Sequence, residues 1–326
     1  MMSADKPARP STKGNRAVTI RSGNPIVREV ARQIAGVSGP RTGFRSGKPA
    51  AATVAGRVLG RAPTEERAAI FVHGSLASGG MWKGYARAFE QDFAVSTPDL
   101  VGYGRNPAWP EGLAFRLRDE VSDFAGRIDG VAEPFDIVAH SYGGLVALRF
   151  AWENPDRVRS LTLIEPTVFR VLADPDFGAP AECAEIATVA DGVREGVLLG
   201  EPDKAMHGFV DYWNGKGAWN MLPDDLRQRF AAQAATVARN FEVGAGDDMP
   251  LEDLRDLDIP TLLISGSRST GAARTTTRIV GDLLPRVETV EIEGAGHMSP
   301  VTHPQAVMRL VDNWLREGRV DRQAAA

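Results

Sequence analysis

Short apolar runs alternate with longer amphipathic segments along the chain from residue 68 onward. Runs rich in Val, Ile and Leu are typical of strands that are buried on both faces of a sheet. We expect such strands at residues 68–72, 93–97, 135–139, 158–164, 260–265 and 287–292. Between them, apolar residues recur at helical spacing in residues 81–90, 117–128, 142–153, 275–284 and 304–316. This alternation predicts an α/β fold with a mostly parallel sheet flanked by helices.

The alternation breaks once, between residues 167 and 248. Helical stretches and turns follow one another there without a strand-like run, and the clearest helical pattern covers residues 223–241. Open α/β sheets bind ligands at the carboxyl ends of their strands. We therefore interpret residues 167–248, the cap segment, as a helical cap over that edge. Residues 51–166 and 249–318 then form the core, and residues 319–326 form a C-terminal tail.

Composition changes this picture mainly at the N-terminus. Hydrophobic residues at 43% and charged residues at 25% are ordinary for a soluble globular protein. Residues 1–61 contain twelve Lys and Arg residues but only two acidic ones, so they carry +10 while the rest of the chain carries −14. We expect residues 1–50 to be a basic extension that is largely disordered, with one short helical pattern at residues 24–35.

Partners and location follow from the same composition. The basic extension has no aromatic residue before Phe44 to stack on bases, so we expect no nucleic-acid partner. No stretch is apolar enough to predict a membrane span. Cys183 is the single cysteine, which suits a cytoplasmic protein, and we interpret it as a small buried apolar residue. The oligomeric state stays open.

The segment FDIVAHSYGG, residues 135–144, runs from a predicted strand through Ser141 into a predicted helix. A sharp strand-to-helix turn needs small residues beside a nucleophile, and Ala139 and the Gly-Gly pair meet that need. The pattern Gly-x-Ser-x-Gly is therefore present with Ala139 in the first position. Such a turn exposes the Ser141 hydroxyl and directs the amide of Tyr142 toward an oxyanion. The alternative is a serine that only caps the helix.

A serine nucleophile needs a base, and the sequence offers five histidines. His297 lies in EGAGHMSP, residues 293–300, a Gly-rich loop directly after the last predicted strand. Such a loop can bring an imidazole within the roughly 3 Å that proton transfer from a serine requires. We therefore predict that His297 is the base. We expect His140 to point away from Ser141, and we assign surface or structural roles to His207 and His303. His73 lies in the loop after the first predicted strand.

A Ser-His pair needs a carboxylate that orients the imidazole. Residues 267–281 contain no carboxylate, and Asp282 lies well inside the next predicted helix. Glu165, in contrast, is a charged residue at the tip of the otherwise apolar strand at 158–164. We predict that Glu165 is the acid. The alternative is a carboxylate that caps the first turn of the cap segment or pairs with an arginine.

The run IFVHGSLASGG, residues 70–80, follows the first predicted strand with a His-Gly pair and a loop of small residues. Such a loop can lend a second backbone amide to an oxyanion. We expect that amide to be the one of Ser75, with Leu76 as the alternative. His73 is expected to hold the shape of the loop.

Taken together, these motifs resemble the α/β-hydrolase superfamily over residues 53–317. The segments that carry the resemblance are HGSLASGGMW at 73–82, PDLVGYG at 98–104, AHSYGG at 139–144, LIEP at 163–166 and GAGHMSP at 294–300. The resemblance implies an eight-stranded, mostly parallel sheet with a helical cap inserted after strand six. It also implies a Ser-acid-His triad that uses neither a metal nor an organic cofactor.

In most members of that superfamily the acid would follow the strand at 260–265, where this sequence has none. Some members, including haloalkane dehalogenases, carry it after the sixth strand, where Glu165 would lie. Those dehalogenases use an aspartate nucleophile, so Ser141 disfavours a dehalogenase or an epoxide hydrolase. Asp99 matches the turn after the fourth strand of the superfamily, and we expect it to be structural.

The predicted function is hydrolysis of a carboxylic ester with a small or medium apolar acyl group, through Ser141, His297 and Glu165. The alternatives left open are cleavage of a C–C bond or an amide, or a perhydrolase activity, on the same triad. A catalytically idle ligand-binding protein is the alternative from another class. The partner we expect is a small ester-like molecule. Its predicted contacts are Leu76, Trp213, Trp219 and Met298.

Overall fold

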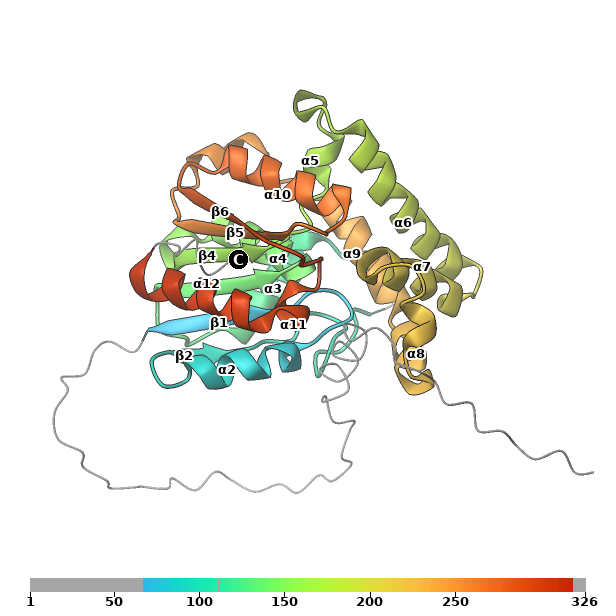
Figure 1. Cartoon of the computed structure of the whole chain (residues 1–326), viewed down its shortest axis with the longest axis horizontal. Coiled ribbons are helices and arrows are strands. Elements are labelled where there is room, and N and C mark those ends of the chain that lie inside the picture. Colours follow the sequence, from blue (N-terminus) through green and yellow to red (C-terminus); the bar gives the residue numbers. More distant parts are fainter. Residues whose placement is uncertain (1–66, 111, 319–326) are drawn as a thin grey trace, which may run out of the picture.

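A computed structural model describes residues 67–110 and 112–318, which contain one sheet of six parallel strands in the order β2-β1-β3-β4-β5-β6. Figure 1 shows helices on both sides of this sheet. The strands are β1 Ala68–Val72, β2 Ala94–Ser96, β3 Phe135–His140, β4 Val158–Ile164, β5 Thr261–Gly266 and β6 Val287–Ile292. They coincide with the six predicted apolar runs to within one residue at each end.

The expected number of eight strands is wrong for the described residues, which hold six. The resemblance supplied the higher number, whereas the apolar runs of this sequence support only these six. The insertion that was expected after strand six accordingly follows β4. Three further predictions fall outside the described residues: the basic extension at 1–50, the first part of the core at 51–66, and the tail at 319–326.

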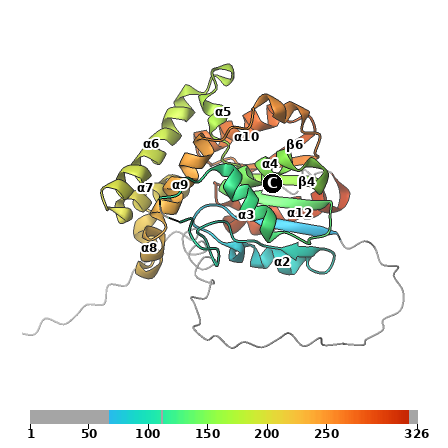
Figure 2. The same ribbon diagram turned by 180° about the vertical axis from the view of Figure 1, so that it is seen from behind.

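Two groups of helices cover the two faces of the sheet (Figures 1 and 2). Side chains alternate between the faces along each strand, so Ile70 and Val72 of β1 pack with α3 and α4, while Phe71 packs with α2 and α12. Burial on both faces explains why every residue of β1 is apolar. The elements of the core outside the sheet are η1 Gly79–Trp82, α2 Lys83–Phe89, α3 Leu117–Arg127, α4 Tyr142–Glu153, η2 Pro155–Arg157, η5 Glu252–Asp256, α10 Gly271–Leu283, α11 Ser299–Thr302 and α12 Pro304–Glu317.

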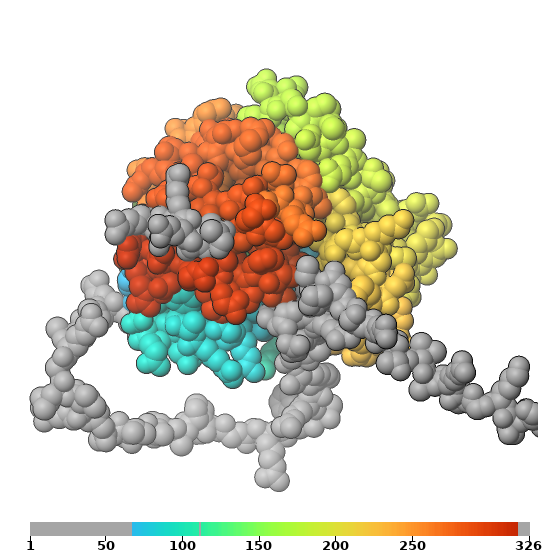
Figure 3. All heavy atoms as spheres, viewed as in Figure 1, coloured from blue at the N-terminus to red at the C-terminus, as the bar shows by residue number. Residues whose placement is uncertain are grey.

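The cap segment is helical and contains no strand in its described residues, 167–248. Figure 3 shows its yellow-green surface beside the red and orange C-terminal part of the core. Its apolar side chains form one continuous buried cluster with those of the core. Its elements are α5 Arg170–Ala173, η3 Pro175–Phe177, α6 Pro180–Leu198, α7 Pro202–Asn214, η4 Trp219–Met221, α8 Asp224–Ala231 and α9 Ala234–Ala245.

The prediction of one helix over residues 223–241 is wrong, because α8 and α9 are separate. The helical path breaks at Gln233, which adopts φ −98° and ψ 1°. Both helices contact α7, but α9 packs mainly against α6. Sequence periodicity does not reveal this break, since the segment contains neither Gly nor Pro between residues 224 and 243.

The parallel strands bring three predicted site residues to one edge of the sheet. Ser141 directly follows β3, Glu165 directly follows β4, and His297 lies in the loop after β6. Ladder hydrogen bonds continue past the strand ends, since the amide of Ser141 donates to Ile164 O at 3.0 Å and the amide of Glu165 donates to Ile264 O at 2.9 Å. The backbones of these two residues are therefore fixed by neighbouring strands.

Candidate active site

Ser141 lies on a tight turn between β3 and α4. Its backbone has φ 54° and ψ −123°, and the residue is 8% exposed. The turn needs glycine at residue 143, because a Cβ atom there would lie 2.3 Å from the carbonyl oxygen of His73. The Ser141 side chain makes no capping hydrogen bond to α4. Its hydroxyl is therefore available for other partners.

His297 connects Ser141 to Glu165 through two hydrogen bonds. Its Nε2 atom lies 3.0 Å from Ser141 Oγ, and its Nδ1 atom lies 2.6 Å from Glu165 Oε2. The imidazole is buried, with 3% of its side chain exposed. Three side chains from separate loops thus form one continuous chain of polar contacts.

Glu165 is held on both carboxylate oxygens. Its Oε1 accepts from the amide of Gly266 at 2.8 Å, and its Oε2 accepts from Ser269 Oγ at 2.6 Å. The Glu165 side chain is fully buried and its backbone has φ 44°. Ser269 stands on the loop after β5, where the superfamily usually carries its acid, and here it supports a carboxylate that comes from β4.

Two further rings fix the position of His297. His140 Nε2 donates to the carbonyl oxygen of His297 at 2.9 Å, and burial, followed by the proximity of His297, lowers the pKa of His140 to about 3. From the cap segment, the indole of Trp213 stacks on the His297 imidazole with centroids 3.9 Å apart. The imidazole is therefore held by a neutral histidine of the core and by a tryptophan of α7.

The loop after β1 faces Ser141 and is held by both the core and the cap segment. His73 Nε2 accepts from the amide of Leu100 at 3.0 Å, which fits its predicted structural role. Asp99 accepts from the amides of Gly79 at 2.7 Å and Arg105 at 2.8 Å, so it too is structural. Leu76 adopts φ 59°, a left-handed conformation that re-aims the loop.

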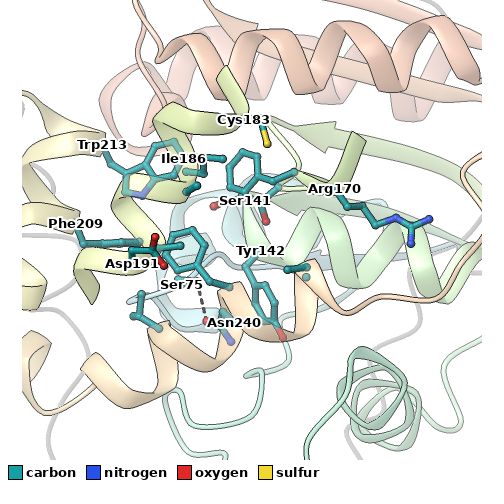
Figure 4. A pocket seen from close by; sticks show the side chains of 18 of the residues that line it. Ser75, Ser141, Tyr142, Arg170, Cys183, Ile186, Asp191, Phe209, Trp213 and Asn240 are labelled. Carbon is teal, nitrogen blue, oxygen red and sulfur yellow. Dashed lines mark hydrogen bonds between the residues drawn. The ribbon is translucent and has the colours of Figure 1, made fainter. Parts of the chain in front are cut away.

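Asn240 of α9 joins the cap segment to this loop. Its Oδ1 accepts from Ser75 Oγ at 2.8 Å and from the buried hydroxyl of Tyr103 at 2.5 Å. Figure 4 shows the contact between Ser75 and Asn240 beside Ser141. The seating of α9 therefore influences the position of Ser75.

A buried carboxyl lies behind the turn. Glu120 accepts from Tyr142 Oη at 3.0 Å and from the amide of Val101 at 2.9 Å. Burial raises the pKa of Glu120 to about 7, although both hydrogen bonds oppose this shift. Burial also raises the pKa of Tyr142 well above its usual value. The phenol of Tyr142 therefore anchors the residue whose amide follows Ser141.

Two cavities meet at Ser141. The larger has a volume of about 290 Å³ and lies against α6, α7 and α9, as Figure 4 shows. The smaller has a volume of about 50 Å³ and includes His297, His140 and Met298 in its wall. Ser75, Ser141, Phe209 and Trp213 belong to both walls.

A sequence model of the alpha/beta hydrolase family matches residues 69–310. The chain belongs to this family. Lipase LipV of Mycobacterium tuberculosis is 32% identical over 173 residues, which is 49% of this chain and 64% of the lipase. Pimeloyl-[acyl-carrier protein] methyl ester esterase of Aeromonas hydrophila is 24% identical over 252 residues, covering 76% of this chain and 94% of the esterase.

Solved structures of alpha/beta hydrolases share the fold of this family member. An alpha/beta hydrolase enzyme from a Medee basin deep-sea metagenome library has a TM-score of 0.64 at 18% identity and covers 81% of this chain and 94% of its own. MenH from S. aureus has a TM-score of 0.61 at 16% identity and covers 78% of this chain and 96% of its own.

In this alpha/beta hydrolase, most of the predicted contact residues line the two cavities. Leu76 and Met298 line the smaller one, and Trp213 lines both. Trp219 lines neither, because it is buried against His207. The interpretation of Cys183 as a buried core residue is wrong, since it is half-buried and lines the larger cavity.

Sequence reasoning did not identify Asn240 or Glu120 in this hydrolase. Both are polar residues at positions where the helical pattern of α9 and α3 faces inward, and both are buried. A polar residue on the apolar side of a helix indicates a buried hydrogen bond, and this pattern could have identified both residues. Within residues 67–110 and 112–318, no group of three or more His, Cys, Asp or Glu side chains could hold a metal ion.

None of the helices in the described part of the hydrolase has the length and apolarity needed to cross a membrane.

Proposed function

We propose that the protein is a serine esterase in which Ser141 is the nucleophile, His297 the general base and acid, and Glu165 the orienting carboxylate. The observation that carries this proposal is the chain of contacts from Ser141 Oγ to His297 Nε2 at 3.0 Å and from His297 Nδ1 to Glu165 Oε2 at 2.6 Å. Both distances suit hydrogen bonds.

The reaction begins when Ser141 Oγ attacks the ester carbonyl carbon and its proton moves to His297 Nε2. The carbonyl electron pair moves onto oxygen, where the backbone amides of Ser75 and Tyr142 stabilise the oxyanion. When that pair returns, the bond to the alkoxy oxygen breaks and His297 gives its proton to the leaving alcohol. Water then attacks the acyl-enzyme by the same route and releases the acid.

Several observations favour an ester as substrate. The larger cavity beside Ser141 is mostly apolar, with Ile186, Val237 and Phe241 in its wall. An apolar wall binds a hydrocarbon acyl group, and it excludes water from the oxyanion. The related proteins are named as a lipase and as a methyl ester esterase, which is the same chemistry.

Labelling with a fluorophosphonate tests the nucleophile directly. We expect one covalent adduct, located on Ser141 by peptide mass spectrometry, and hydrolysis of a panel of methyl and p-nitrophenyl esters that Ser141→Ala abolishes. Ser96→Ala on the edge strand β2 is the matched control and should keep full turnover. An adduct on another residue, or turnover by Ser141→Ala, contradicts the assignment of the nucleophile. A protein that is labelled but hydrolyses no ester of the panel contradicts the esterase function.

A further inference from the structure

The two cavities at Ser141 differ in volume and in their relation to His297. The smaller cavity, about 50 Å³, has His297 in its wall, whereas the larger one, about 290 Å³, does not. A single water needs roughly 10–15 Å³ of such space, so the smaller cavity admits only a few non-hydrogen atoms. The larger cavity admits several times more.

The proton transfer decides which group of an ester enters which cavity. Ser141 Oγ, the oxyanion, the acyl chain and the alkoxy oxygen surround one tetrahedral carbon. The oxyanion points to the backbone amides, and the alkoxy oxygen must lie within hydrogen-bond reach of His297 Nε2 to receive its proton. The alkoxy group therefore occupies the cavity that His297 lines, and the acyl chain takes the remaining direction.

The two charged residues in the wall of the larger cavity, Arg170 and Asp191, make their hydrogen bonds with other parts of the protein. Two guanidinium nitrogens of Arg170 donate to the carbonyl oxygens of Asp247 and Met249, and Figure 4 shows this group turned away from Ser141. Asp191 is exposed and pairs with Arg194 at 2.8 Å. These are the charged residues in that wall. The cavity therefore favours an uncharged hydrocarbon chain.

We infer that the substrate is an ester of a small alcohol with an apolar carboxylic acid of medium length, bound with its alkoxy group against His297 and Met298 and its acyl chain against α6 and α9. This inference rests on the proposed esterase function. It adds the direction in which the ester binds and the small size of its leaving alcohol.

A pair of isomeric esters tests the direction of binding, because methyl hexanoate and pentyl acetate have the same composition and place the chain on opposite sides of the carbonyl. We expect kcat/KM, measured by acid release in a pH-stat, to be at least about tenfold higher for methyl hexanoate, a ratio that the loss of about one methylene contact already produces. Equal rates, or a preference for pentyl acetate, would overturn the inference and leave the esterase function standing.

Two substitutions test whether the two cavities cause the preference for methyl hexanoate over pentyl acetate. Ala190 of α6 lines only the larger cavity, so Ala190→Phe should lower kcat/KM for methyl hexanoate more than for pentyl acetate. Met298 lines only the smaller one, so Met298→Ala should raise kcat/KM for pentyl acetate relative to methyl hexanoate. Ala184→Phe on the exposed side of α6 is the matched control and should leave the ratio unchanged.

The possible outcomes distinguish failure of the esterase function from failure of the inferred binding direction. Hydrolysis of neither isomer by a protein that still hydrolyses other esters of the panel overturns the inferred substrate alone. Hydrolysis of no ester at all contradicts the esterase function itself, and the direction of binding falls with it. Hydrolysis with the preference reversed, or with a ratio that Ala190→Phe and Met298→Ala do not move, overturns only the direction of binding.

Discussion

Leu76, Ser141 and Glu165 adopt positive φ angles of 59°, 54° and 44°, and they are the only residues other than glycine that do so in the described ranges. Left-handed backbone is unfavourable for a residue with a side chain, and it persists only where surrounding contacts enforce it. All three line or support the same site, on three separate loops. Backbone strain is therefore concentrated at the candidate active site, where three loops must direct their residues toward the same place.

The position of Glu165 beside His297 could be predicted from a feature that the neighbouring loop lacks. The loop after β5 has no carboxylate, while a lone charge stands at the tip of apolar β4. Its contacts with Gly266 and Ser269 were not predictable, since they depend on how two neighbouring loops fold together.

Replacing Glu165 by glutamine tests the orienting role. The amide keeps the shape of the side chain but cannot stabilise a charged imidazolium, so we expect kcat to fall by about 10³- to 10⁴-fold on p-nitrophenyl esters. The thermal midpoint, followed by circular dichroism, shows whether the fold is kept. Glu293→Gln, an exposed carboxylate four residues before His297, is the matched control. A rate near that of the unaltered protein would falsify the assignment of Glu165.

At the scale of the elements, the strands were predictable and the arrangement of the cap segment was not. A parallel strand that is buried on both faces has an apolar run that can be recognised in the sequence, as β1 and β5 illustrate. The position of a cap helix depends on which core surface it covers, and helical periodicity states only that one side is apolar. For this reason Trp213 and Trp219 were predicted alike, although only Trp213 reaches the site.

Alanine substitutions at two helical glycines, one at the crowded turn beside Ser141 and one in open space on α6, test how tightly the turn is packed. Gly143→Ala places a Cβ atom 2.3 Å from the backbone of His73, so we expect a lower thermal midpoint and loss of turnover. Gly192 of α6 has nothing within 4 Å of such an atom. Gly192→Ala should therefore stabilise the protein by about 0.5–1 kcal/mol through helix propensity.

Differential scanning calorimetry and an ester assay on both variants provide the measurement. A Gly143→Ala protein with unchanged midpoint and turnover would show that the turn relaxes freely, which contradicts the close approach of α4 to the loop after β1.

For the whole molecule, Glu120 links stability to pH. Its pKa is raised from 4.5 to about 7 in the folded protein, so the folded state holds a proton that the unfolded chain releases. The contribution of Glu120 to the free energy of unfolding therefore falls as pH rises from about 4.5 to 7. Below and above this range the contribution does not change with pH. His140 acts in the opposite sense, since its lowered pKa removes stability as pH falls below 6.5.

The variant Glu120→Gln isolates this contribution. A neutral amide can still accept from Val101, so we expect the variant to be more stable than the unaltered protein at pH 8, by at most about 3 kcal/mol. The advantage should vanish near pH 4.5. Thermal midpoints across this range measure it, and the effect of His140 cancels because both proteins carry it. Glu90→Gln on the exposed end of α2 should show no such pH dependence. An advantage that is the same at all pH values would contradict the raised pKa.

The stack of Trp213 on His297 is one of the contacts that join the cap segment to the core. Indole fluorescence is sensitive to an adjacent imidazole, and more so to its protonated form. Trp213 is therefore a built-in optical reporter that senses both the charge of His297 and the distance between cap and core. The sequence contains six tryptophans, so the signal of Trp213 is obtained as the difference between the unaltered protein and Trp213→Phe. A change in the distance between the two rings during turnover can then be measured without an attached dye.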